Sequence, residues 1–341
     1  MLRNLLLVLV LLLPLSMMAQ SEEVRRRLQR ADSVRRVADS VIAGRYRDSR
    51  HYDTLYIRRP PTRWTIKLRA NVSGASLRVG SIKKYSENHG HIQKDVKGTI
   101  AIAANYMGIG AGLALNPGKL LGKRNYTDIE FNLNSYSNRY GFDIVFSKAD
   151  NYSGTFRLDG TEHDVERKMI KMEMLNINAY YAFNGRRFSF PAAFTQSYLQ
   201  VHSAGSWLVG VSFMGCVTNL HDTDIAHFDN ARVYLGNFSV GGGYGYNLVT
   251  RHRWLFHLSA LPTLVVINRN NMKVEDGDKT RSPFSFPDFI LTERAAVVHD
   301  FTDNWFASGT LVMNNSIFGK PDKLFMGFNK WRVRIALGRR L

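Results

Sequence analysis

The side chains best suited to nucleophilic chemistry lie in one short segment, where His202 and Ser203 precede Ser206. A serine hydrolase needs a histidine base within reach of the serine hydroxyl and a third group that orients the histidine. Neighbouring residues of a strand point to opposite faces, so His202 and Ser203 could cooperate only in a turn. The segment is typical of a small-residue turn, and no orienting group is evident. We therefore expect no catalytic residues, and keep a membrane-embedded lipid hydrolase as an alternative.

Two other segments contain residue types that bind metals or phosphates in other proteins. The spacing of His221, Asp222, Asp224 and His227 matches no metal-site signature. The glycines of 241–245 lack the lysine and the following helix of a phosphate-binding loop, and favour a strand that bends in a barrel wall. The sequence thus predicts no metal and no cofactor, and we expect the protein not to be an enzyme.

The N-terminus has the pattern of a cleaved export signal. Arg3 precedes an apolar run over 5–15, and a short exit segment ends at Ala19. The run is too short for a comfortable transmembrane helix, and polar sequence follows it, so residues 1–19 are predicted to be a signal peptide. Because Cys216 is the only cysteine, neither a lipid anchor near the cleavage site nor an internal disulfide is expected.

Residues 20–63 are predicted to form a basic periplasmic helix and a linker. Apolar residues recur at helical spacing between Val24 and Val41, with arginines at many of the other positions. Pro60 and Pro61 cannot continue a helix and mark the boundary of this region. A solvated extension is favoured over a helix that docks on a barrel mouth or on acidic periplasmic partners.

The formal net charge of +18 raises the question of an anionic partner. Export argues against nucleic acid. Lysine and arginine clusters suit anionic lipid headgroups, the phosphates of lipopolysaccharide or a basic lumen equally well. We expect outer-membrane lipid and lipopolysaccharide as partners and no nucleic acid, and the sequence does not indicate an oligomeric state.

From residue 64 to residue 341 the hydrophobicity has a period of two. The chain is 45% hydrophobic and 12% aromatic, yet no later apolar run reaches the roughly 20 residues of a membrane helix. The alternating runs are 64–72, 129–133, 142–146, 175–183, 207–213, 238–246, 254–260 and 331–337. Their repetition, with aromatic residues near the ends, is typical of transmembrane β-barrel strands that turn apolar side chains to lipid.

The links between these runs alternate in length, as the two sides of such a barrel require. The long links, expected outside the cell, are 79–96, 117–125, 150–168, 217–230, 268–287 and 318–324. The tight links, expected in the periplasm, are 105–108, 137–139, 249–253 and 299–304. One link, 184–203, is long although it should be periplasmic, and a bulge or a small plug would explain it.

The fold predicted for residues 64–341 is an all-β, antiparallel, transmembrane up-and-down barrel of about twelve strands. Its last run, 331–341, is an amphipathic C-terminal strand of the kind that the barrel-assembly machinery recognises. The predicted location is the outer membrane. Cys216, near the outer end of its strand, should react with a thiol reagent from outside the cell.

Three segments also carry a resemblance to a known family. They are 132–143, 188–194 and 203–206. These segments resemble domain-of-unknown-function family 4421, a family of outer-membrane β-barrel-like proteins of Bacteroidota, over about residues 53–341. The resemblance implies location and fold, and brings no established activity or catalytic residue with it.

Barrel closure predicts where the interior charges lie. The first and last strands must be neighbours, which places inward Lys67 and Arg69 beside inward Arg332 and Arg334. The same alternation points Asp128, Glu130 and Asp143 inward from other strands and gives an acidic wall. A bore of about twelve strands is narrow, and unpaired charges in it are costly, so we expect the walls to pair and plug the barrel.

The predicted function is therefore a structural, gated or narrow-pore barrel. A weakly anion-selective pore would result if the two walls did not pair. The further alternatives are the lipid hydrolase and a soluble periplasmic β-protein that binds a ligand.

Overall fold

The computed structural model divides the chain into two units, residues 1–49 and 50–341. The structure describes residues 33, 36, 52–62, 64–80, 89–106, 109–120, 126–158, 161–221, 231–273, 280–281, 288–320 and 324–341. Ser33 and Arg36 are helical. The signal peptide predicted for 1–19 and the rest of the predicted basic helix lie outside the described residues, so both stay predictions.

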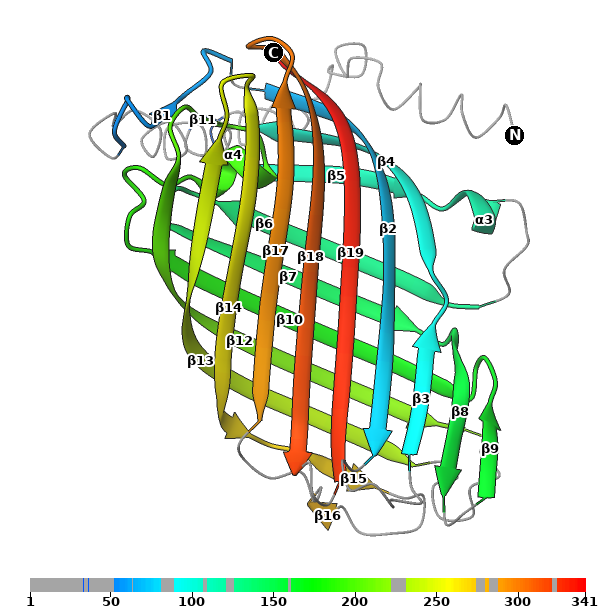
Figure 1. Cartoon of the computed structure of the whole chain (residues 1–341). Coiled ribbons are helices and arrows are strands. Elements are labelled where there is room, and N and C mark those ends of the chain that lie inside the picture. Colours follow the sequence, from blue (N-terminus) through cyan, green and yellow to red (C-terminus); the bar gives the residue numbers. More distant parts are fainter. Residues whose placement is uncertain are drawn as a thin grey trace. The chain divides into compact units, whose positions relative to one another are not determined.

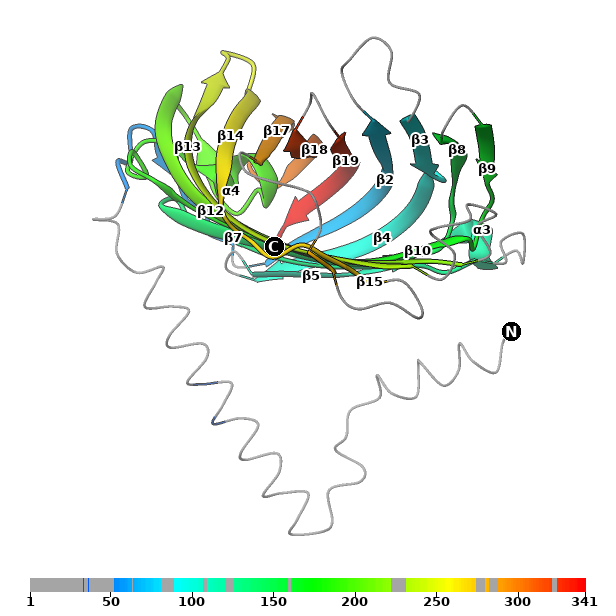
Figure 2. The ribbon, with the colours of Figure 1, turned by 90° about the horizontal axis from the view of Figure 1, so that it is seen from below.

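The second unit is built from one large antiparallel sheet that closes on itself (Figures 1 and 2). Its wall strands are β2 (Trp64–Gly80), β4 (Lys97–Tyr106), β5 (Ile109–Leu115), β6 (Asp128–Tyr136), β7 (Tyr140–Ala149), β10 (Ile170–Ala182), β12 (Ala204–Leu220), β13 (Arg232–Val249), β14 (Trp254–Asn268), β17 (Phe289–Asp300), β18 (Trp305–Lys320) and β19 (Leu324–Arg340). Each pairs with the next, and β19 pairs with β2 from Phe325↔Gly80 to Arg340↔Thr65. The predicted all-β barrel is confirmed, with twelve wall strands among the described residues.

The period-two pattern of the sequence becomes the two faces of this wall. On β2, Ile66 and Leu68 are exposed on the outer face, whereas Thr65 and Lys67 are buried on the inner face. We call the end that carries Leu341 the C-terminal end and the opposite end the loop end. Exposed aromatic side chains follow the C-terminal end of the wall, at Trp64, Tyr140, Tyr181, Phe183, Trp207, Tyr244, Tyr246, Trp254 and Trp305.

The links differ between the two ends, as the sequence predicted. Tight turns over 137–139, 250–253 and 301–304 connect strands at the C-terminal end. Longer connections lie at the loop end and contain short elements that the sequence did not reveal: β3 (His89–Lys94), α3 (Pro117–Leu120), β8 (Tyr152–Leu158), β9 (Thr161–Val165), β15 (Asn271–Lys273) and β16 (Thr280–Arg281). Among the described residues no helix has the length and apolar character needed to cross a membrane.

One seam of the wall is weakly paired. The described residues of β5 and β6 share a single ladder pair, Ile109↔Ser135. Nearer the loop end, β3 pairs directly with β8 from His89↔Arg157 to Lys94↔Tyr152. This second pairing bridges the wall beyond the weak seam.

The interior at the loop end is filled by an apolar layer. Its buried members are Ala75, Leu77, Ile92, Ala149, Tyr152, Val165, Ile170, Met172, Met174, Cys216, Leu235 and Phe328. Cys216 is a free thiol that is 4% exposed within this layer. The expectation that it is accessible from outside is therefore not supported by the structure, because its side chain lies on the inner face of β12.

Candidate functional site: a charged and plugged barrel interior

The middle of the interior holds ion pairs between strands that are not neighbours in the wall. Glu130 on β6 forms an ion pair with Arg332 on β19 and a second with Lys330, 3.3 Å away. Side-chain exposure is 10% for Glu130 and 13% for Arg332. Because β5, β4 and β2 separate β6 from β19 in the wall, these contacts cross the lumen.

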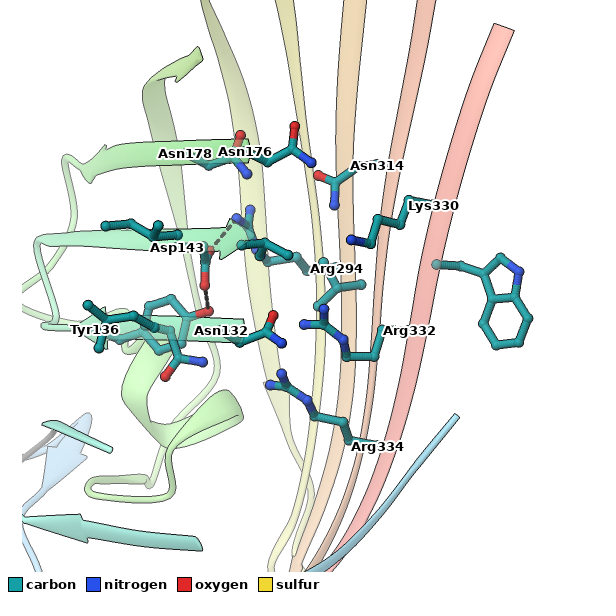
Figure 3. A pocket seen from close by; sticks show the side chains of 16 residues that line it. Asn132, Tyr136, Asp143, Asn176, Asn178, Arg294, Asn314, Lys330, Arg332 and Arg334 are labelled. Atoms are coloured by element: carbon teal, nitrogen blue, oxygen red, sulfur yellow. Dashed lines mark hydrogen bonds and ion pairs between the residues drawn. The ribbon is translucent and has the colours of Figure 1, made fainter. Parts of the chain in front are cut away.

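The other two predicted acids have partners that the sequence analysis did not identify. Asp128 binds Lys94 at 2.8 Å and Lys97 at 3.2 Å, next to the junction of β3 and β4. Asp143 binds Arg294 of β17 at 2.9 Å, and the hydroxyl of Tyr136 donates to the same carboxylate (Figure 3). Arg294 was missed because no clean alternation was recognised in its segment, although 290, 292, 294 and 296 are all buried inward positions.

The predicted basic wall is only partly compensated. The Lys67 ammonium donates to Gln196 Oε1 at 2.5 Å, and Arg332 contacts Glu130. Within the described part of the chain, the side chains of Arg69 and Arg334 make no hydrogen bond and no ion pair. The structure thus brings Arg332 to an acid of the opposite wall and leaves two arginines without one.

A cavity of about 40 Å³ lies between these walls (Figure 3). Its charged lining residues are Asp143, Arg294, Lys330, Arg332 and Arg334, and asparagines 132, 134, 176, 178 and 314 line it as well. A water needs about 10–15 Å³ of such space, so the cavity has room for roughly three. It is a pocket within the lumen.

The long link at the C-terminal end folds into the barrel, and we call residues 184–203 the plug segment. It contains the short helix α4 (Phe190–Phe194) and β11 (Leu199–Gln200), which pairs with β1 (Ile57–Arg58). Figure 1 shows α4 at the end where the C-terminus lies. The small plug considered from the sequence is therefore present.

The local sequence explains how the plug segment turns. Ser189 caps α4, and its hydroxyl accepts a hydrogen bond from the Ala192 N–H at 3.3 Å. Pro191 suits the first turn, where a helix leaves N–H groups unpaired. Gln196 follows with a positive φ of 55° and ends the turn. Phe188 and Phe190 are fully buried, so the segment is anchored by aromatic side chains.

Contacts of the plug segment reach opposite sides of the wall. Gln196 accepts from Lys67 of β2 through its side chain and from Arg340 of β19 through its carbonyl, at 3.0 Å. Phe190 packs on Tyr180 of β10 and on His257 of β14, with ring centroids 4.4 and 5.1 Å apart. The plug segment is therefore attached to β2 and β19 on one side of the barrel and to β10 and β14 on the other.

A buried polar chain joins the plug segment to the wall. His257 Nδ1 lies 2.7 Å from Asn247 Oδ1, and His257 Nε2 lies 2.9 Å from Ser259 Oγ. The Asn247 amide group donates to Ser189 O and to Gln200 Oε1, which directs its oxygen toward the imidazole. His257 therefore carries its proton on Nδ1 and accepts from Ser259. Serine, histidine and a third group follow one another as in serine hydrolases, but an amide stands where those enzymes have a carboxylate.

The serine and histidine considered from the sequence are not joined in this way. His202 Nδ1 lies 2.5 Å from the Leu55 carbonyl oxygen, whereas the Ser203 hydroxyl accepts from the Val249 N–H at 2.9 Å. Both contacts fix the end of the plug segment. The described residues contain no group of three or more metal-ligating side chains, and Asp222, Asp224 and His227 lie outside them.

The chain was compared with solved structures and curated proteins. The solved structures include the translocator domain of autotransporter NalP from Neisseria meningitidis, at 10% identity and a TM-score of 0.35, covering 91% of this chain and 98% of that one. The outer membrane protease OmpT from Escherichia coli is 9% identical with a TM-score of 0.35, and the match covers 83% of this chain and 97% of that one. OmpT, an outer membrane protein of Vibrio cholerae, is 8% identical with a TM-score of 0.33, and the match covers 80% of this chain and 96% of that one. The chain has no match among curated proteins.

These structural likenesses are too low to carry an argument about activity, and the fold rests on the chain's own strand pairing. The family comparison is of a different kind, because it covers most of the chain. The family described as Domain of unknown function (DUF4421) matches residues 51–340, and the chain belongs to that family.

Proposed function

We propose that this protein is an integral outer-membrane β-barrel that is closed at rest, with a structural or gated role, and that a cleaved signal peptide exports it. The observation that carries the proposal is the plug segment, which is anchored to opposite sides of the wall. The proposed environment is outer-membrane lipid and lipopolysaccharide, after insertion by the barrel-assembly machinery. The family resemblance supports an origin in Bacteroidota.

The outer face supports a membrane location. Apolar side chains such as Leu68, Ile102 and Phe131 are exposed there at 58%, 65% and 59%. A soluble sheet would expose them to water at a cost of about 25 cal/mol per Å², whereas lipid accepts them. The aromatic residues near the C-terminal end fit one interfacial girdle, and short turns at that end fit the periplasmic side.

The interior supports a closed state for two reasons. The plug segment occupies the C-terminal end, and ion pairs such as Glu130–Arg332 cross the middle. An acid and a base in contact across a narrow lumen leave little space for a hydrated ion. Opening a path requires the plug segment to leave its contacts with Lys67, Arg340 and Asn247.

Planar-bilayer recording tests the closed state. We expect almost no conductance from the refolded wild-type protein. Replacing residues 186–200 by a short Gly-Ser turn removes only the plug segment, so this variant should conduct only in combination with Arg332→Ala and Phe328→Ala, which also thin the charged and apolar layers. The same replacement combined with Phe183→Ala, on the exposed surface, is the matched control. Large, stable wild-type conductance would refute the closed state.

Fractionation tests the location. We expect the mature protein in the outer membrane, resistant to carbonate extraction, with heat-modifiable migration on gels, because a closed barrel leaves no unpaired strand edge. Recovery in the soluble periplasmic fraction would instead support the alternative of a soluble β-protein.

The buried Ser259–His257–Asn247 chain favours a second candidate function, a hydrolase. Fluorophosphonate labelling of the wild-type protein that is lost in Ser259→Ala, but kept in Ser203→Ala, would support it. If no label reaches Ser259 even in the variant that lacks residues 186–200, the chain of hydrogen bonds only attaches the plug segment to the wall.

A further inference from the structure

Three arginines lie together on the inner face of the first and last strands. The register pairs Arg332 with Ser73, Arg334 with Asn71 and Ala336 with Arg69. Arg69 and Arg334 are therefore diagonal neighbours on one face, within reach of long side chains. Arg332 lies two residues further along β19 on the same face.

The acids of the interior are already shared among other cations. Glu130 forms ion pairs with Arg332 and Lys330, whereas Asp143 forms one with Arg294. Arg69 and Arg334 receive no carboxylate from the described residues, and Arg69 Nε is buried without a hydrogen-bond partner. The wall formed by β2 and β19 thus carries an excess of positive charge.

An uncompensated guanidinium is costly in an interior of low polarity. Lysine would offer relief by losing its proton, but arginine keeps its charge at all physiological pH values. An anion bound next to these guanidinium groups would compensate the excess positive charge. The protein supplies none to Arg334 from the part of the chain that is described.

The cavity next to these arginines has the size and the lining for such an anion. Arg332 and Arg334 reach into it from β19, toward Asn132 (Figure 3). Its volume of about 40 Å³ leaves room for a small ion. Guanidinium groups match the paired oxygens of phosphate, and asparagine amides add neutral donors.

We propose that this cavity is a binding site for one small tetrahedral oxyanion, inorganic phosphate or sulfate, held by Arg334 and Arg332 with Arg69 beside them. The inference rests on the closed barrel proposed above, since a plugged lumen keeps the ion from exchanging freely. It adds a ligand class to an interior that otherwise has only a mechanical role.

Radiolabelled phosphate tests the site. The full mature protein is refolded in detergent with labelled inorganic phosphate, so that the ion can enter before closure, and is then separated by gel filtration. We expect retention of roughly one phosphate per barrel, reduced when sulfate is present during refolding and unchanged when chloride is present at equal ionic strength. Equal retention in the presence and absence of excess unlabelled phosphate would overturn the proposal.

Matched variants locate the site. Arg334→Gln should weaken phosphate retention at least tenfold, and Arg69→Gln, whose side chain lies beside the cavity and does not line it, should weaken it less. In the absence of phosphate, these variants should be at least as heat-stable as the wild type, because an unpaired charge has been removed. The temperature at which the folded band disappears from the gel measures this stability. Arg339→Gln removes the same charge from the exposed outer face of β19 and should bind like the wild type. Full retention by Arg334→Gln would overturn the assignment.

A third comparison separates a free ion from a phosphate group on a larger molecule. Glycerol 3-phosphate, similar in size to part of a lipid headgroup, should compete more weakly than inorganic phosphate, because its glycerol group replaces one of the oxygens that the arginines and asparagines of the cavity would bind. Competition equal to that of inorganic phosphate would overturn the small-ion assignment. Conductance is recorded on the same samples. A barrel that conducts and still retains phosphate would refute the closed state and leave the binding site standing.

Discussion

The interior of this barrel is filled in two different ways. The loop end is closed by an apolar layer that includes Leu77, Met174 and Phe328, whereas the middle is closed by charged pairs such as Glu130–Arg332. Apolar packing loses only the removed atoms and their contacts when a side chain is shortened. A buried ion pair leaves an uncompensated charge when one partner is removed. The two layers should therefore respond differently to small changes.

The largest effect is expected in the charged layer. Glu130→Gln removes the carboxylate that Arg332 and Lys330 share, and should lower the free energy of unfolding by about 3–5 kcal/mol. Denaturant unfolding in detergent, followed by tryptophan fluorescence, measures it. A loss under about 1 kcal/mol would contradict the pairing across the lumen.

A truncation in the apolar layer comes next. Leu77→Ala should cost about 2–5 kcal/mol, because Leu77 is 8% exposed and its removal leaves a cavity. The loss should be the same at low and high salt. A strong salt dependence would show that the two layers are not energetically separate.

A change of shape without loss of volume should matter less. Met174→Leu conserves volume in the same apolar layer and should cost less than about 1.5 kcal/mol. The same unfolding experiment measures it. A cost as large as that of Leu77→Ala would show that the layer demands one particular side chain.

The smallest effect is expected for an ion pair on the outer face at the loop end, where β7 ends and β10 begins. Lys148 and Glu173 are 2.6 Å apart, and their side chains are 34% and 37% exposed. Glu173→Gln should cost about 0.2–1 kcal/mol, because solvent screens such a pair. This variant makes the same chemical change as Glu130→Gln, so the ratio of the two losses measures what burial contributes.

The sequence predicted the barrel because alternation is a local property that each strand shows by itself. The same alternation predicted that Glu130 and Arg332 point inward, and closure predicted that the first and last strands, β2 and β19, are neighbours. It could not assign Lys94 to Asp128, because Lys94 lies in a segment interpreted as a loop and found as β3. Pairing between distant strands depends on the curvature of the ring, which no local pattern reports.

The plug segment shows the same limit. Its length was noticed as an exception, but its contacts with Lys67, His257 and Arg340 join positions far apart in the chain. A local sign was available in the closely spaced phenylalanines of 188–194, which are unusual for an exposed turn. Aromatic side chains in a link between strands indicate that the link is buried.

The backbone hydrogen bonds that close the barrel also bear on the order in which its parts fold. Trp64 and Leu341 exchange hydrogen bonds of 3.0 and 2.8 Å, which join β2 to the residue that follows β19. Contacts between such distant residues form late, because a long loop must first be closed. The Gln196 carbonyl meets Arg340 only when that seam forms. We therefore expect the plug segment to settle before the seam between β19 and β2 is complete.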